Sequence, residues 1–338
     1  MKILIIGAAG MVGSKLSRRL IEDQQLNGQA LSTLTLVDLS VPVAPGYDGN
    51  TTTVKVNCLK ADLTRQQAAA RLLDDKPDVI YHLAAVVSGE AESDMRKGYS
   101  VNVDGMRLLL ESIRDLHEAD GYTPKLIFTS SIAVYGAPFP TPIPDEFHLT
   151  PLTSYGTQKA ICELMLADYS RKEIIQGLGL RLPTICVRPG KPNKAASSFF
   201  SNIIREPING QQAILPVEKD VQHWFASPRT AVDFLCHAAS LDRTVVGTLC
   251  NMNLPGLCAT VGEQIDALTR VVGTDAARLI ISKPDTVIKA IVDTWPQSFD
   301  AKQAMQLGFK AEKTFDELVH VYLEDDYNKS THGSRILD

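Results

Sequence analysis

The sequence lacks any long hydrophobic run. Its 338 residues are 44% hydrophobic, yet no apolar stretch approaches the roughly 20 residues that a membrane-spanning helix needs. The first apolar run, over residues 3–6, is too short for a secretory signal and ends at a glycine. We therefore expect no membrane segment, a cytoplasmic location, and a strand at this position.

Strong charge of one sign and metal-binding spacings are also missing. The formal net charge is -5, and such mild acidity disfavours a nucleic-acid or anionic-membrane surface. None of the six cysteines forms a C-x-x-C pair, and the seven histidines show no H-x-x-x-H or H-E-x-x-H spacing. We expect reduced, buried thiols and no metal site.

Apolar strand patterns alternate with helical patterns over the first 190 residues. Strands are predicted over 2–6, 34–37, 54–59, 78–83, 125–129 and 182–187, and helices over 11–22, 62–74, 93–116 and 154–175. Repeated β–α units with continuously apolar strands are typical of a parallel sheet covered on both faces. The sequence therefore predicts an α/β fold of the Rossmann type, with a doubly wound parallel sheet.

The texture of the chain changes after Arg188, where prolines interrupt it repeatedly. We expect a main dinucleotide-binding domain over 1–188 and a smaller C-terminal α/β substrate lobe over 189–327. A helix near 228–240 is expected to return to the main domain. The polar segment 328–338 is expected to be a flexible tail.

A glycine-rich turn joins the first strand to the first helix. Gly7, Gly10 and Gly13 follow residues 2–6, with Met11 and Val12 opening the helix. This context predicts a dinucleotide site, because a helix N-terminus offers free N–H groups to a pyrophosphate. Asp38 closes the second strand, where a carboxylate accepts ribose hydroxyls and repels a 2′-phosphate. The predicted cofactor is NAD rather than NADP.

Tyr155 and Lys159 are four residues apart on a predicted helix and share one face. A lysine ammonium one turn away favours the phenolate form of the tyrosine, which then accepts a proton. Taken alone, Y-x-x-x-K is a weak signal. It gains weight because the glycine turn, Asp38 and Ser131 precede it in that order.

With these motifs in order, residues 1–240 resemble the extended short-chain dehydrogenase/reductase family, which includes nucleotide-sugar epimerases and dehydratases. Ser130-Ser131-Ile132-Ala133-Val134-Tyr135-Gly136 matches its S-S-x-x-V-Y-G run, and Arg188-Pro189 its R-P turn. The resemblance implies Ser131, Tyr155 and Lys159 as catalytic residues. It also implies cofactor contacts at Asp62, Leu63, Leu83, Ala84, Ala85 and Asn102, in addition to Gly7, Gly10, Met11, Val12, Gly13, Asp38, Tyr155 and Lys159.

The substrate region departs from the epimerase pattern. Gln222 stands where those enzymes have an arginine that grips a diphosphate, and Lys191 replaces an asparagine. The segment 188–205 resembles the branch of the family that oxidises the C2 hydroxyl of D-erythronate, a small sugar acid. Lys191 is then the first candidate for the substrate carboxylate, and Ser197 and Ser198 are candidate hydrogen-bond donors. A solvated loop is the other interpretation of all three.

Other residues near the site have ordinary interpretations. His82 is expected to be structural. Arg205 is either a partner of the substrate carboxylate or a charge on a helix surface, and we favour the surface. We favour core packing over pocket lining for His223, Trp224 and Phe225, and a solvated helix start for the acidic segment 89–94.

Two alternative functions stay open. The first is a nucleotide-sugar 4-epimerase or dehydratase, for which Phe199, Phe200 and Arg229 could serve a nucleotide. The second is a non-catalytic NAD-sensing regulator or structural subunit, which the intact Tyr155 and Lys159 disfavour. A homodimer is expected through the helix over 93–116 and the helix that carries Tyr155, as in proteins resembling this one.

Overall fold

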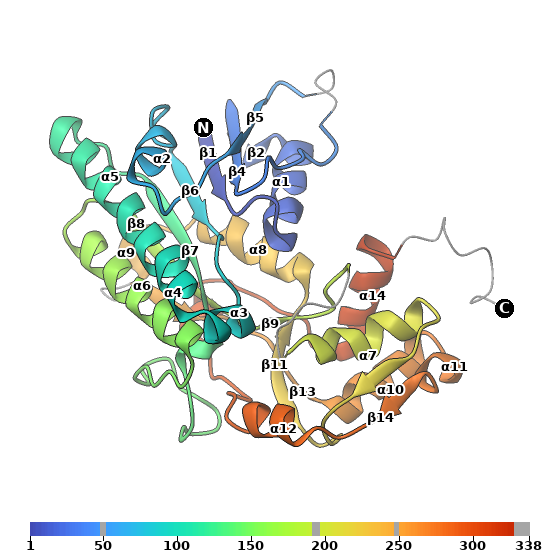
Figure 1. Cartoon of the computed structure of the whole chain (residues 1–338). Helices are drawn as coiled ribbons and strands as arrows, with labels where there is room; N and C mark the ends of the chain where they lie inside the picture. The colour runs from blue at the N-terminus through green and yellow to red at the C-terminus, as the bar shows by residue number, and fades with distance from the viewer. Residues whose placement is uncertain (48–51, 191–196, 247–249, 328–338) are drawn as a thin grey trace.

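The computed structural model describes residues 1–47, 52–190, 197–246 and 250–327. Its centre is a seven-stranded parallel sheet in the order β12–β8–β7–β6–β1–β4–β5 (Figure 1). Residues 3–6 of β1 are all buried, as expected of a strand covered on both faces. The strands are β1 (Lys2–Ile6), β4 (Thr33–Asp38), β5 (Lys55–Lys60), β6 (Val79–His82), β7 (Lys125–Ser131), β8 (Gln176–Leu182) and β12 (Asn251–Asn253).

Helices cover both faces of this sheet (Figure 1). On one face α2 (Gln66–Arg71) packs against α5 (Gly105–Asp120), and α5 packs against α6 (Ser154–Arg171). On the other face α1 (Met11–Asp23) packs against α8 (Pro228–Ala238). The apolar side of α5, with Leu109, Leu110 and Ile113, is fully buried in the main core. The predicted doubly wound α/β fold is confirmed.

The helix predicted over 93–116 is broken into pieces. It consists of α4 (Met95–Gly98), a π-helical turn η1 (Tyr99–Asp104) and α5, and a separate helix α3 (Ser88–Ser93) precedes it. The wider turn carries Asn102, whose side chain exchanges hydrogen bonds with the backbone of Val86 at 2.7 and 3.1 Å. Irregular turns of this kind often accompany functional sites.

The strand predicted over 182–187 is wrong, because only residues 182, 184 and 185 lie in strands and they belong to two different ones. The sheet strand is β8, and the short β9 (Thr184–Ile185) joins another sheet. Strand β8 contains two glycines, which are unusual in strands, so the sequence pattern did not indicate it. Close packing nevertheless requires glycine at both positions. A Cβ at Gly177 would lie 2.3 Å from Ser170 Oγ, and one at Gly179 would lie 1.8 Å from Asn251 Oδ1.

A second hydrophobic core lies beyond the sheet and includes Phe200, Ile203, Phe225 and Leu268. Around it are a three-stranded sheet β13–β11–β9 and a parallel pair β10–β14. The elements of this region are α7 (Ser198–Ile208), β10 (Ala213–Leu215), β11 (Gln222–Ala226), β13 (Leu257–Thr260), α10 (Val261–Val271), α11 (Thr274–Ala277), β14 (Ile280–Ser282), α12 (Thr286–Val292) and α14 (Phe315–Asp325). The remaining elements are β2 (Gln25–Leu26), β3 (Gln29–Ala30), a 3-10 turn η2 (Ile132–Val134), α9 (Arg243–Val246) and α13 (Lys302–Gln306).

No helix within the described residues has the length and apolar character needed to cross a bilayer.

Candidate active site

The carboxyl ends of β1, β6, β7 and β8 meet at one edge of the parallel sheet. The loops that leave this edge line a cavity of about 280 Å³, the position at which doubly wound sheets bind ligands. Its walls also include residues of β9, β11 and the segment after α12. The lining side chains are Val12, Leu83, Ala85, Val87, Ser88, Thr129, Ser130, Ser131, Ile132, Ala133, Thr153, Tyr155, Lys159, Leu182, Pro183, Thr184, Ile185, Arg188, Ser197, His223, Trp295 and Pro296.

The glycine turn forms a cradle that leaves no room for side chains. Gly7 has φ +94°, and a Cβ there would lie 2.6 Å from Ala84 N. A Cβ at Gly13 would lie 2.2 Å from Gly7 O. The first turn of α1 carries no acidic residue, and its N-cap Gly10 makes no side-chain cap. The N–H groups of this turn therefore suit a dinucleotide phosphate.

Asp38, the last residue of β4, is tied to the same turn. Its Oδ2 accepts from Ala9 N at 3.0 Å, and its Oδ1 accepts from Leu39 N at 2.7 Å. A carboxylate has about four acceptor positions, so both oxygens retain capacity for ribose hydroxyls. Met11 and Val12 open α1 beside it, and Val12 lines the cavity.

The other predicted cofactor residues differ in position. Leu83 and Ala85 line the cavity, and Ala84 N donates to Ile6 O at the end of β1. Asp62 follows β5 and accepts from Thr64, while Leu63 beside it is buried. Asn102 is buried and is not part of the cavity lining; it links the loop after β6 to Gln158 of α6.

Tyr155 is held close to Ser131 by the start of α6. Thr153 caps this helix by accepting from Gly156 N at 3.1 Å. A Cβ at Gly156 would lie 2.1 Å from Ala133 O, so only glycine lets α6 approach the turn after β7. Ser131 Oγ accepts from Ala133 N at 3.2 Å. Both hydroxyls consequently line one cavity.

Lys159 lies one turn further along α6 and is 2% exposed. Its Nζ donates to Thr129 O at 2.8 Å and lies 5.6 Å from the centroid of the Tyr155 ring. The ammonium is therefore fixed between β7 and the tyrosine.

The substrate candidates separate in the structure. Ser197 lines the cavity, whereas Ser198 is buried at the start of α7 and is not part of the lining. Lys191 lies outside the described residues. Arg188, which the sequence interpretation left as part of a turn motif, lines the cavity.

His223 also lines the cavity, while Trp224 and Phe225 pack in hydrophobic cores. His223 Nε2 lies 2.6 Å from Thr184 Oγ1, and its ring stacks on Phe200 with a centroid separation of 5.0 Å. Burial lowers the pKa of His223 to about 3, so the ring is neutral near pH 7. His82 is buried too, and burial followed by the charge of Lys159 lowers its pKa to about 3.

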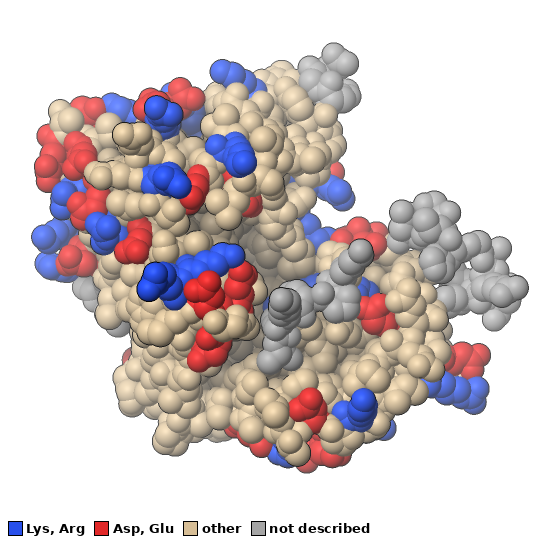
Figure 2. All heavy atoms as spheres, in the orientation of Figure 1, with Lys and Arg blue, Asp and Glu red and all other residues tan. Residues whose placement is uncertain are grey.

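The cavity is positively charged although the whole chain is acidic. Among the described lining residues the charged side chains are Lys159 and Arg188, and none is an aspartate or glutamate. Figure 2 shows acidic and basic groups mixed over the outer surface. Such a cavity favours an anionic ligand.

Some expectations about neighbouring residues were wrong. Arg205 is buried, not on a surface, and its Nε donates to Glu206 at 3.0 Å. The amphipathic α7 turns this side chain towards the chain segment at Arg188, whose carbonyl accepts from Arg205 Nη1 at 2.8 Å. The acidic segment 89–94 belongs to the short helix α3 and its end, and Glu92 and Asp94 are exposed, in line with the expectation; Glu92 also accepts from Ser154 N at 2.9 Å.

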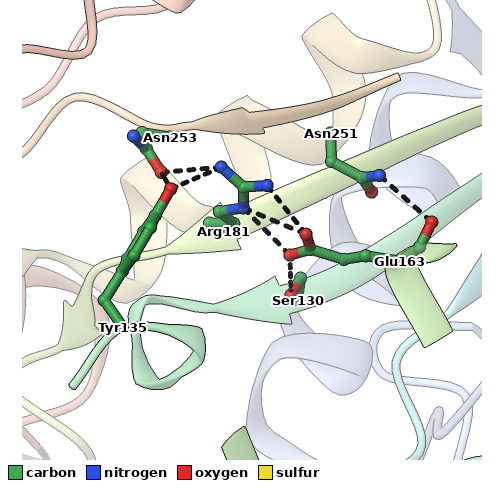
Figure 3. Close-up of polar contacts among 6 residues, drawn as sticks. All are labelled: Ser130, Tyr135, Glu163, Arg181, Asn251 and Asn253. Atoms are coloured by element: carbon green, nitrogen blue, oxygen red, sulfur yellow. Dashed lines mark hydrogen bonds and ion pairs between the residues drawn. The ribbon is translucent and has the colours of Figure 1, made fainter. Parts of the chain in front are cut away.

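A buried polar network includes Ser130, one of the residues that line the cavity (Figure 3). Glu163 of α6 binds Arg181 of β8 through two nitrogens, at 3.0 and 2.8 Å, and accepts from Ser130 Oγ at 2.5 Å. On its other side Arg181 Nη1 donates to the hydroxyl of Tyr135, which donates to Asn253 of β12 at 2.9 Å. The network joins α6, β7, β8 and β12, and α6 and β7 also carry Tyr155, Lys159 and Ser131.

No disulfide joins any of the six cysteines, all of which are described. In the described part of the chain no three histidine, cysteine or acidic side chains gather where they could hold a metal ion.

Comparison with known proteins identifies relatives over nearly the full length. Residues 3–238 match the NAD dependent epimerase/dehydratase family. A D-erythronate dehydrogenase of Cupriavidus necator is 43% identical over 96% of this chain and 98% of its own length. One of Haemophilus influenzae is 38% identical over 96% of this chain and all of its own length.

A solved structure carries a different name. The nucleoside-diphosphate-sugar epimerase of Agrobacterium tumefaciens is 55% identical and superposes with a TM-score of 0.93, over 96% of this chain and 94% of that one. The L-threonine 3-dehydrogenase of Trypanosoma brucei, 21% identical with a TM-score of 0.82 over 99% of both chains, shares the fold.

Proposed function

The chain belongs to the NAD dependent epimerase/dehydratase family, and we propose that it oxidises the C2 hydroxyl of D-erythronate, a small sugar acid, with NAD. The names of the two curated relatives support this substrate. The observation that carries the proposal is the cavity, whose described charged lining residues are both cations. Positive charge without a carboxylate selects an anionic substrate.

In this proposal Tyr155 is the general base. Its phenolate accepts the proton of the substrate alcohol, and the nearby ammonium of Lys159 favours that charged form. NAD, when bound, supplies the hydride acceptor. Gly7, Gly10 and Gly13 leave room for its pyrophosphate, and Asp38 receives its ribose hydroxyls.

Ser131 orients the reacting oxygen. Because its Oγ already accepts from Ala133 N, its own proton remains to be donated to the substrate. With Tyr155 on the same cavity wall, two groups then fix one oxygen, which restricts it to a reactive position.

The test is a panel of four- and five-carbon aldonates with NAD, followed by NADH absorbance. We expect D-erythronate to be oxidised, and Tyr155→Phe to lower kcat by about 10²–10⁴-fold with NADH affinity retained. Absence of NADH with every aldonate would refute the proposal.

A second candidate, nucleotide-sugar epimerisation, is favoured by the name of the Agrobacterium structure. Three features disfavour it here. Gln222 is exposed at the start of β11 and does not line the cavity. Arg229 is paired with Glu324 and Asp325, while Phe199 and Phe200 are buried. Thermal protection by UDP-glucose, without protection by D-erythronate, would support the epimerase.

We also propose a homodimer formed through α5 and α6. These helices lie side by side (Figure 1), and Leu164 on α6 is 65% exposed. Light scattering should give twice the chain mass, and Leu164→Glu should give the monomer. A cytoplasmic location, supported by cysteines without disulfides, is testable by cell fractionation.

A further inference from the structure

We propose that Arg188 binds the carboxylate of the substrate and so determines which hydroxyl is oxidised. This inference rests on the proposed function, and it assigns the anion to a residue that the motif analysis had left in a turn. Three observations carry it: how Arg188 is fixed, what it lacks, and what it faces.

The chain around Arg188 is clamped. Its backbone N donates to Ser201 Oγ at 3.0 Å, and its carbonyl accepts from Arg205 Nη1 at 2.8 Å. Its Nε donates to Ile185 O at 2.9 Å. No described residue hydrogen-bonds its two terminal amino groups, and the side chain lines the cavity. The guanidinium is thus fixed through Nε, and its two terminal amino groups are available to a ligand in the cavity.

Arg188 also lacks a carboxylate. The two arginines that are fully buried each have a partner: Arg181 pairs with Glu163, and Arg205 with Glu206. No acidic side chain among the described residues pairs with Arg188. Burial lowers its pKa because desolvation opposes the charge. A half-buried cation without a counter-charge is costly, and a bound anion reduces that cost.

The other polar groups of the cavity are not suited to the anion. Lys159 is committed to Thr129 O and lies beside Tyr155. The ring of His223 is neutral near pH 7. Arg188 is therefore the available cation of the described lining, and its planar fork matches a carboxylate with two parallel hydrogen bonds.

The position of Arg188 relative to the base explains the choice of hydroxyl. It shares the cavity with Tyr155 and Ser131. In this proposal a carboxylate held at Arg188 directs the adjacent carbon, C2, towards those two hydroxyls of the same cavity. The hydroxyls at C3 and C4 lie further along the substrate.

The test compares D-erythronate with its neutral amide, D-erythronamide, in wild type, Arg188→Gln and Arg188→Lys. Arg270→Gln is the control, since Arg270 is an exposed arginine paired with Asp316. Losing a buried charge partner costs about 10²-fold or more. We expect that loss in kcat/KM for the acid with Arg188→Gln and little change for the amide. Arg188→Lys should fall between, because an ammonium lacks the fork.

NADH affinity and melting temperature, measured on the same proteins, should stay near wild type and would reveal a folding defect. Equal losses for acid and amide, with wild type still oxidising D-erythronate, would overturn the role of Arg188 alone.

Calorimetric titration of D-erythronate in the presence of NADH separates the two proposals. Wild type that binds the acid without oxidising it, with binding lost in Arg188→Gln, would support the anion site and overturn the dehydrogenase. Wild type that neither binds nor oxidises it would overturn both.

Discussion

The buried pair of Glu163 and Arg181 allows a quantitative prediction of stability. Their side chains are 1% and 8% exposed, and two arginine nitrogens bind the carboxylate (Figure 3). Glu163→Gln keeps the shape of the side chain but removes its charge. The guanidinium of Arg181 is then left buried without its counter-charge.

Removing one partner of such a pair costs about 3–5 kcal/mol. The entropy of unfolding is about 2.1 cal/mol/K per residue, which for 338 residues amounts to ~0.7 kcal/mol/K. The melting temperature should therefore fall by about 4–7 °C in Glu163→Gln, and by a similar amount in Arg181→Met.

The double variant tests the cause. With both charges removed, no unpaired charge remains, so its loss of stability should be smaller than the sum of the single losses by at least about 2 kcal/mol. Urea unfolding followed by circular dichroism measures all four proteins. Asp293→Asn, which breaks the exposed pair with Lys289, is the control and should cost at most about 0.5 kcal/mol. Additive single losses would refute the reasoning.

The remaining predictions concern the cofactor, acid stability and the approach of α6. Gly13→Ala should abolish NADH binding in a fluorescence titration, because the new Cβ would lie 2.2 Å from Gly7 O, whereas Gly105→Ala, with its nearest atom at 3.5 Å, should bind NADH normally. His82 and His223 have pKa values of about 3 in the folded state, so only the unfolded chain takes up their protons between pH 6.5 and 3. Stability should fall in that range by up to about 1.4 kcal/mol per pH unit for each histidine, and a urea midpoint unchanged between pH 7 and 5 would contradict this. Gly156→Ala should lower kcat by displacing Tyr155 from Ser131, while NADH affinity is kept; an unchanged kcat would show that the 2.1 Å contact with Ala133 O is relieved elsewhere.

The parts of the fold that the sequence predicted correctly are those determined by residues close together in the chain. The turn at Gly7 and the apolar strand before it are neighbours in the chain, so spacing and residue type suffice. The position of strand β8 was predicted wrongly because two of its residues, Gly177 and Gly179, are not typical of strands. They are glycines because Ser170 and Asn251 pack against them and leave no room for a Cβ. Asn251 belongs to β12, some seventy residues away, and no local pattern announces that contact.

The same distinction explains the site. Tyr155 and Lys159 share a helix face, so their pairing follows from spacing. Trp295 reaches the cavity from the far end of the chain, where a single aromatic residue gives no signal. Arg188 had a detectable signal: a charged residue directly after an apolar run, at the sheet edge where Ser131 and Tyr155 gather. The sequence analysis instead proposed Lys191, three residues further along the chain, as the residue that binds the substrate carboxylate.

Arg181 and Arg188 are expected to have different roles: Arg181 contributes to the stability of the fold, and Arg188 to the choice of substrate. Arg181 has its counter-charge within the chain, so the free energy of that pair is released on folding and is independent of substrate. Arg188 has none among the described residues, so an anion that enters the cavity offsets its desolvation. Arg181→Met should therefore lower the melting temperature and leave the preference for acid over amide intact. Arg188→Gln should leave the melting temperature near that of wild type and remove the preference for acid over amide. Proteins place such uncompensated groups at functional sites, and the contrast between these two residues of one type locates the substrate end of the cavity.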